Sequence, residues 1–140
     1  MSFINDLKIG QEYERIALRK IQSLYDVKII DREKNNYSYD FKDSNDTKYE
    51  VKYDRKSNET GNFFIEYVSK NKPSGISNTE SDKYIFMVNK EDGYMIDTSV
   101  LKEMIIDKKY KRNIKCFLEG KVVGGYLFSK DFIIDNSIKI

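Results

Sequence analysis

The sequence predicts an α/β fold, in which helices pack against a β-sheet. Three observations favour this class: an N-terminal stretch with apolar residues at helical spacing, several later stretches that alternate with the period of a strand, and a second helical stretch that begins near Thr98. With 140 residues, of which 39% are hydrophobic and 14% aromatic, the chain is large enough for one folded core. Residues 1–140 are therefore expected to form a single domain.

The composition excludes several classes of protein. The net charge is only +2, so any contact with nucleic acid must come from a local patch and not from a generally basic chain. The chain lacks histidine, which excludes Ser-His-Asp and Cys-His catalysis, histidine zinc sites and histidine general bases. No long apolar run and no charged leader is present, so we expect no membrane contact and a cytoplasmic protein.

The first helix is predicted over residues 5–25, with Asn5 or Asp6 as its N-cap. At 100° per residue, its apolar side chains form one broad arc that is suited to a core. Glu14 falls inside this arc. A carboxylate that faces a core needs a partner, which is either a metal site with its water shell or a lysine such as Lys20.

The next elements are predicted to be three strands. Residues 27–31 form a β-branched run that is typical of a strand. Residues 37–42 and 47–54 each alternate aromatic or aliphatic residues with polar or charged ones, and they would pair as a hairpin across residues 43–46. One face of this hairpin then faces a core, and the other carries charge.

The charged face of the hairpin is the first candidate site. Asp40 stands on its first strand, while Glu50 and Lys52 stand on its second, so the three side chains can project from one surface. Two carboxylates and an ammonium suit a hard divalent cation such as Mg²⁺. The alternative is that these charges form the solvated face of an ordinary α/β domain.

At these residues the chain resembles the PD-(D/E)XK nuclease superfamily. The resemblance covers Gly10 to about Tyr84, and it is strongest for the small Holliday-junction resolvases and related phage-type nucleases. It implies a restriction-endonuclease-like core, which is a central mixed β-sheet flanked by helices. Tyr39 stands where the family has proline, at a position that shapes the backbone and carries no chemistry.

The resemblance also implies roles for the residues of the charged face. Asp40 and Glu50 would bind the metal, and the backbone carbonyl of Val51 would be a further ligand. Lys52 would orient the attacking water or stabilise the negative charge of the transition state.

The same resemblance extends to the first helix. Resolvase-like members carry a G-x-x-x-E-R motif there, and it is matched by Gly10 and Glu14-Arg15. Glu14 is thereby a candidate catalytic residue, which would support a second metal ion or its hydration shell.

The implied function is Mg²⁺-dependent endonucleolytic hydrolysis of DNA, with Mn²⁺ able to replace Mg²⁺. By family analogy the DNA would be branched, and a symmetric homodimer would bring two sites to two strands. The alternatives are a restriction-type or exonuclease-type enzyme, and a DNA-binding or assembly module on the same fold that has lost turnover.

Two polar connections are candidates for DNA contact. Residues 55–61 directly follow Lys52, and residues 69–81 form a long loop that contains the only proline. Each is predicted either to contact phosphate groups or to be a solvated connection. The candidate residues in them are Arg55, Lys56, Lys70, Lys72 and Ser74.

Between and after these connections the sequence predicts further strands at residues 62–69, 83–89 and 94–97, of which 83–89 is apolar enough to be central. Glu66 is the only charge inside the first of them. It is predicted either to face the metal site or to protect an edge strand from pairing.

The C-terminal part is predicted to begin with a helix capped by Thr98 and running to about residue 108. A basic cluster follows it. The cluster either is exposed to solvent at the helix end, where the helix dipole favours positive charge, or contacts DNA. The cluster consists of Lys108, Lys109, Lys111, Arg112 and Lys115.

The last stretches are predicted from their glycines and apolar runs. Glu119-Gly120-Lys121 predicts a turn between strands, and residues 122–129 predict a strand pair that bends at Gly124-Gly125. Cys116 lies among apolar residues and is expected to be buried. Residues 131–140 are compatible with either a strand or a helix.

Overall fold

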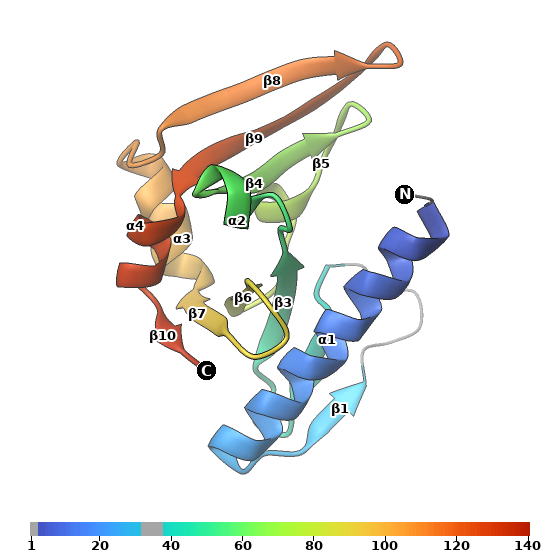
Figure 1. Ribbon diagram of the computed structural model, residues 1–140, viewed down its shortest axis with the longest axis vertical. Helices are drawn as coiled ribbons and strands as arrows, with labels where there is room; N and C mark the ends of the chain where they lie inside the picture. Colours follow the sequence, from blue (N-terminus) through green and yellow to red (C-terminus); the bar gives the residue numbers. More distant parts are fainter. Residues whose placement is uncertain (1–2, 32–37) are drawn as a thin grey trace.

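The strands of the computed structural model form two β-sheets, and one long helix lies along the outer side of the larger sheet (Figure 1). The structure describes residues 3–31 and 38–140. Residue 37, at the start of the strand expected at 37–42, lies outside the described residues.

The larger sheet has six strands in the order β1-β2-β3-β6-β7-β10. Strands β3 and β6 run parallel, and the other neighbours are antiparallel. This confirms an α/β fold with a mixed sheet, in which the apolar strand β6 is central. The strands are β1 (Ile29–Asp31), β2 (Phe41–Asp43), β3 (Lys48–Tyr53), β6 (Lys83–Met87), β7 (Gly93–Asp97) and β10 (Ile138–Lys139).

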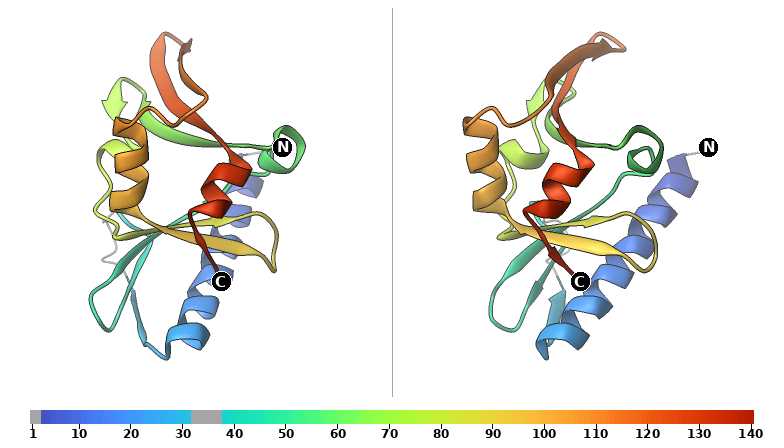
Figure 2. Two further views of the ribbon diagram at one scale, coloured as in Figure 1. Left: turned by 90° about the vertical axis from the view of Figure 1, so that its left-hand side faces the viewer. Right: turned by 60° about the vertical axis from the view of Figure 1, so that its left-hand side comes forward.

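The smaller sheet has four antiparallel strands in the order β5-β4-β9-β8. Its strands β8 and β9 form a long hairpin that projects away from the larger sheet (Figures 1 and 2). The strands are β4 (Asn62–Ser69), β5 (Lys72–Pro73), β8 (Arg112–Leu118) and β9 (Lys121–Ser129).

The helices divide between the two faces of the larger sheet. Helix α1 (Phe3–Tyr25) packs against β3 and β6 on one face. Helices α3 (Thr98–Ile106) and α4 (Lys130–Asp135) share a core with the smaller sheet on the other face. Two short helical segments, α2 (Ser57–Thr60) and η1 (Gly75–Ser77), lie in connections. None of the described helices combines the length and the apolar character needed to cross a bilayer.

Each face of the larger sheet therefore has its own core. On the α1 side, Ala17 and Ile21 have no exposed surface and pack with Tyr49 and Ile85. A small residue such as Ala17 lets the helix backbone approach the strands closely. On the other side, Tyr84 and Phe86 of β6 pack with β4, β9, α3 and α4. Alternate residues of β3 and β6 thus point into different cores.

Two predictions about the smaller sheet are wrong. Residues 122–129 belong to one continuous strand, β9, and not to a strand pair or hairpin, although the register of β9 against β4 shifts at Gly124 and Gly125. Their role is close packing, because a Cβ at Gly125 would lie 2.4 Å from the Phe64 ring and one at Gly124 would lie 3.1 Å from Val68. Cys116 is exposed, because β8 is an edge strand and nearly all of its side chains face solvent.

The two polar connections are more ordered than the sequence predicts. The first contains α2, which ends at Gly61 with a left-handed backbone (φ 72°) that glycine tolerates best. The second contains β5 and η1, and Ile76 of η1 is buried in the core. The turn Glu119-Gly120 between β8 and β9 is confirmed, and both of its residues have positive φ.

The helix boundaries also differ from those predicted. Helix α1 already includes Phe3, so neither Asn5 nor Asp6 is its N-cap. The N-cap of α3 is Asp97, and Thr98 is its first helical residue. The basic cluster lies after this helix, in the turn that leads to β8 and in β8 itself.

Candidate active site

The β2–β3 hairpin fixes the carboxylate of Asp40 against strand β3. The Asp40 backbone N–H donates to the Tyr49 carbonyl at 2.8 Å, which extends the ladder by one residue beyond β2. The Asp40 Oδ2 in turn accepts the Val51 N–H at 2.7 Å. This carboxylate is therefore held beside the middle of β3, next to the residues on either side of Val51.

The two ionisable residues that flank Val51 are Glu50 and Lys52, and their side-chain ends lie next to each other. The Lys52 Nζ lies 3.4 Å from the Glu50 Oε1. Glu50 is buried, with 9% of its surface exposed, whereas the Lys52 side chain is 42% exposed. The ammonium thus stands between the buried carboxylate and solvent, where it can meet a phosphate group.

Burial, and after it the neighbouring carboxylate of Asp40, raise the pKa of the Glu50 carboxyl to about 8. The Lys52 ammonium acts in the opposite direction but does not outweigh burial. At neutral pH the pair Asp40–Glu50 is therefore short of positive charge, and a proton on Glu50 substitutes for it.

Strand β6 brings a third group to this place. Tyr84 lies beside Glu50 in the parallel ladder and is 1% exposed. Burial and the charge of Glu50 raise the pKa of its hydroxyl. Thr79 lies close enough to lower this pKa, yet within residues 3–31 and 38–140 the hydroxyl finds no hydrogen-bond partner of good geometry. A buried polar atom without a partner is costly, and such atoms occur where a bound ion or water completes the site.

These observations fit a divalent cation. Mg²⁺ is commonly bound through one or two carboxylates and keeps several waters, one of which could bond to the Tyr84 hydroxyl. Asp40 and Glu50 supply the two carboxylates, and a cation would replace the proton that Glu50 otherwise holds. Deep burial of the Glu50 side chain would exclude competing solvent from that ligand.

Glu14 stands on a different element, helix α1. Within residues 3–31 and 38–140, no three Asp, Glu, Cys or His side chains come together as a metal-binding set. Glu14 belongs to α1, which packs on the face of β3 that carries Tyr49, whereas Glu50 and Lys52 alternate onto the other face. Of the four residues that the sequence predicts for the site, the structure brings Asp40, Glu50 and Lys52 together.

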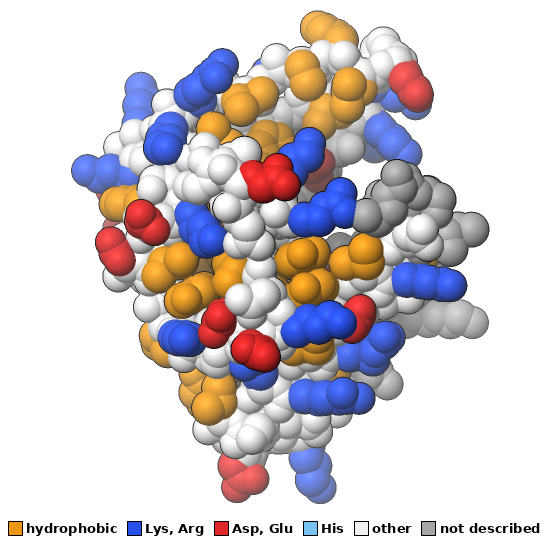
Figure 3. All heavy atoms as spheres, viewed as in Figure 1, with side chains coloured by type: hydrophobic (Ala, Val, Ile, Leu, Met, Phe, Trp, Pro, Cys, Tyr) orange, Lys and Arg blue, Asp and Glu red, His pale blue; other side chains and the backbone are white. Residues whose placement is uncertain are grey.

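The basic residues of the first connection lie close to this group. Arg55 and Lys56 follow shortly after the end of β3 and are exposed. Together with Lys52 they line a hollow in the protein surface. Lys111 from the basic cluster reaches the rim of this hollow, where its Nζ donates to the Asn62 side chain at 2.8 Å. On the side of the molecule shown in the space-filling view, lysine and arginine side chains are spread between apolar patches (Figure 3).

The second connection places its basic residues elsewhere. Lys70 and Lys72 lie at the far end of β4 from Asn62, and eight residues of strand span roughly 25 Å. Ser74 lies between these ends, and its hydroxyl donates to Glu66 at 2.9 Å. Glu66 is therefore a partner of the connection, and its charge also acts on the Tyr84 hydroxyl.

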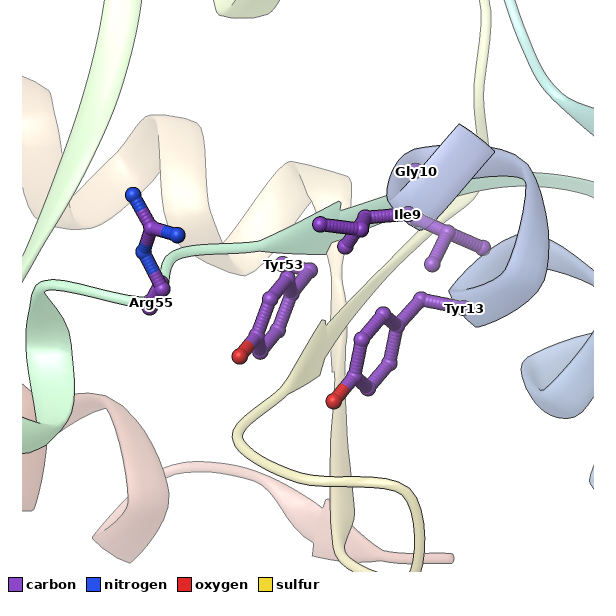
Figure 4. A pocket seen from close by; sticks show the side chains of 6 residues that line it. Ile9, Gly10, Tyr13, Tyr53 and Arg55 are labelled. Carbon is purple, nitrogen blue, oxygen red and sulfur yellow. The ribbon is translucent and has the colours of Figure 1, made fainter. Parts of the chain in front are cut away.

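A second pocket, of about 240 Å³, opens on the α1 side of β3 (Figure 4). The rings of Tyr13 and Tyr53 stack across it with centroids 3.8 Å apart. Ile9 lines it beside these rings, and Arg55 stands beyond Tyr53 at its other side. Arg55 and Tyr53 line both this pocket and the hollow beside Lys52.

No protein-family model matches the sequence, and a search of curated proteins finds no significant relative.

Proposed function

We propose that the protein is a Mg²⁺-dependent nuclease that hydrolyses phosphodiester bonds in DNA, and that its larger sheet is the core of a restriction-endonuclease-like fold. The proposal is carried by one observation, which is the meeting of Asp40, the buried Glu50 and the half-exposed Lys52 at the middle of β3. Resemblance of these residues to the PD-(D/E)XK pattern supports it, as does the unpartnered hydroxyl of Tyr84 beside them.

In this mechanism Asp40 and Glu50 would hold the metal, together with the backbone carbonyl of Val51. When bound, Mg²⁺ supplies a water of lowered pKa and neutralises charge on the scissile phosphate. The Val51 N–H orients the Asp40 carboxylate through the bond to its Oδ2. The Lys52 ammonium, half-exposed above Glu50, binds the phosphate and stabilises the charge that grows on it.

The substrate is proposed to be structure-selective DNA, such as a branched junction, and the active form a symmetric dimer. Both follow from the family resemblance alone. A four-way junction compared with linear duplex, flap and single-stranded DNA tests the first, and the mass in solution tests the second. Preference of a monomer for linear ends would overturn the junction assignment.

A non-catalytic DNA-binding module is the second candidate, and one observation favours it. Glu14 does not join Asp40 and Glu50 in a set of three acids within the described part of the chain. Such a module would shift DNA in a gel with or without Mg²⁺ and would leave it uncut.

Nicking of supercoiled plasmid with Mg²⁺ or Mn²⁺ tests the proposal. Lys52→Ala should lower the rate by at least about 100-fold, which is typical for loss of one charged group that stabilises a transition state. Lys48→Ala is the matched control, because Lys48 lies on the same strand and its ammonium sits over the Tyr39 ring. Equal rates for the two variants would contradict the assignment of Lys52.

A further inference from the structure

A hollow of about 490 Å³ opens next to Lys52 and is used by none of the proposed metal ligands. Its walls come from the end of β3, the α2 segment and the outer face of the smaller sheet. This volume lies in the range of pockets that hold small organic ligands. The residues that matter for its chemistry are Lys52, Arg55, Lys56, Asn62, Phe64 and Leu127.

Phe64 presents an aromatic ring to this hollow. It is 38% exposed, whereas its neighbours Phe63 and Ile65 are 1% and 3% exposed because they point into the core. The ring lies against the backbone of β9, since a Cβ at Gly125 would meet its Cζ at 2.4 Å and its Cε2 at 2.6 Å. Leu127 lies opposite Phe64 across the two strands and extends the apolar wall. Because Gly125 has no side chain, the Phe64 ring can pack directly on the backbone of β9.

Positive charge lies beside this ring. Lys52, Arg55 and Lys56 line the hollow together with one carboxylate, that of Asp54. The Asp54 oxygens accept backbone N–H groups, from Lys56 at 3.1 Å and from Phe64 at 3.3 Å. Asp54 therefore ties the first connection to β4, and the lining keeps a net positive charge.

An apolar aromatic surface bordered by cations is the combination that binds nucleotides, because the ring stacks on the base while the cations attract the phosphate. A base inside a duplex has both faces covered by its neighbours, so it cannot stack on a protein ring without leaving the stack. A hollow with a flat ring in its wall therefore favours a base that is already unpaired.

We propose that this hollow binds an unpaired nucleotide of a DNA strand, with its base against Phe64 and its phosphate against Arg55 and Lys56. The inference rests on the proposed function for the choice of DNA as the polymer, but not on turnover. It names the class of substrate that the site takes: single strands, flaps and branch points with unpaired bases, in preference to uninterrupted duplex.

The test is binding of the full chain, without divalent metal, to three DNA probes: a single strand that carries 2-aminopurine, a strand of equal length made of abasic residues, and the duplex. Fluorescence of 2-aminopurine reports stacking directly. We expect the single strand to bind most tightly. Phe64→Leu should weaken its binding about 10-fold or more, which is the usual effect of losing one base–aromatic stack.

Two variants control for the loss of an exposed aromatic residue and for folding. Phe117→Leu removes a ring that is 72% exposed on the edge strand β8, away from the hollow, and should bind as the wild type does. Phe64→Tyr keeps the flat ring and should restore stacking if Phe64→Leu proves less stable. Lys56→Gln should weaken the binding of both the base-bearing and the abasic DNA strand and should lower the salt dependence of that binding. Lys102→Gln on α3 should change neither.

The outcomes separate this inference from the proposed function. Equal binding of abasic and base-bearing strands, or of wild type and Phe64→Leu, would overturn the inference even if Lys52-dependent nicking is found. If the protein stacks a base tightly through Phe64 but never cuts DNA, the inference would be supported and the proposed nuclease activity would be contradicted. An acidic peptide that displaces the strand equally well from wild type and from Phe64→Leu would show a mere polyanion surface and would also overturn the inference.

Discussion

The two faces of strand β3 have opposite character although they lie in one six-residue strand. The face toward α1 carries Tyr49, Val51 and Tyr53, which pack with apolar residues of the helix. The other face carries Glu50 and Lys52, with the carboxylate of Glu50 buried beside Tyr84. The first arrangement stabilises the fold by removing apolar surface from water. The second buries the Glu50 carboxyl and the Tyr84 hydroxyl, and the described part of the chain compensates for their burial only in part.

This difference teaches where the fold derives its stability and where it gives some up. A buried carboxylate costs free energy unless a cation or hydrogen bonds compensate for it, and the Lys52 ammonium compensates only in part. A face that is costly in the folded protein alone is expected at a site whose missing charge is supplied by a ligand. Mutations on the two faces should therefore affect stability with opposite signs.

The largest effect is expected from the apolar face. Ile21→Ala removes a side chain with no exposed surface from the contact between α1 and the larger sheet, and it should lower the free energy of unfolding by about 2–4 kcal/mol. Urea denaturation measures this change. Leu24→Ala is the matched control on the same helix, because Leu24 is 56% exposed and its loss should cost less than about 1 kcal/mol. Equal losses would mean that α1 does not pack on this face.

The charged face should make the stability of the protein depend on pH. The Glu50 pKa is raised from 4.5 to about 8 in the folded protein, so between these values the unfolded chain loses the proton that the folded protein keeps. The contribution of Glu50 to stability is therefore complete below pH 4.5, falls as the pH rises, and is lost above pH 8.

Glu50→Gln removes this dependence. Without divalent metal, the variant should be more stable than the wild type at pH 8, by roughly 1–3 kcal/mol, and the difference should vanish near pH 4.5. Thermal or urea unfolding at both values measures it. Mg²⁺ should stabilise the wild type at pH 8 but not the variant. Glu59→Gln on the exposed α2 segment is the control and should not change stability with pH in this way. If Glu50→Gln gained no stability at pH 8, the pKa shift of Glu50 would be contradicted.

The charged face could be predicted because its signal is local. Alternation within residues 47–54 and the pairing of this stretch with the strand before it place Asp40, Glu50 and Lys52 on one surface, and the hairpin register confirms that pairing. Strand period and turn position suffice for such a result.

The partners of the charged face could not be predicted, since they come from long-range packing. Tyr84 meets Glu50 only through the parallel pairing of β3 with β6, which no local pattern reveals. Phe64 joins Lys52 in one hollow because the first connection folds back onto the smaller sheet. Gly125, which sequence patterns assign to a bend, in fact makes room for this ring.

Glu14 tests how far the charged site extends toward the helix. The resemblance of residues 10–15 to a nuclease motif implies a role for Glu14 at the metal site, while α1 packs on the opposite face of β3. We expect Glu14→Gln to lower the nicking rate only about 10-fold, as for a residue that acts through water, and far less than Glu50→Gln. Glu12→Gln is the control on the same helix, because Glu12 pairs with Lys90 at 3.1 Å. A loss as large as that of Glu50→Gln would place Glu14 among the metal ligands.

The smallest effects concern two buried tyrosines, one on each face of the larger sheet. The Tyr49 hydroxyl donates to the Asp43 Oδ2 at 2.7 Å, whereas the Tyr84 hydroxyl has no hydrogen-bond partner among the residues that the structure describes. Without metal, Tyr49→Phe should lower the free energy of unfolding by about 1 kcal/mol, because it leaves a buried carboxylate oxygen with one donor fewer. Tyr84→Phe should leave stability unchanged or raise it by up to about 1 kcal/mol, since it removes an unpaired polar atom.

The two tyrosines should differ again when Mg²⁺ is present. If the Tyr84 hydroxyl bonds to a water of the bound ion, Tyr84→Phe gives up that bond and should bind Mg²⁺ more weakly, while Tyr49→Phe binds it as the wild type does. Calorimetric titration with Mg²⁺ measures this, and chemical denaturation measures the stabilities. Two variants that change stability with the same sign, or that bind Mg²⁺ alike, would show that the two faces do not differ in the way their hydrogen bonds indicate.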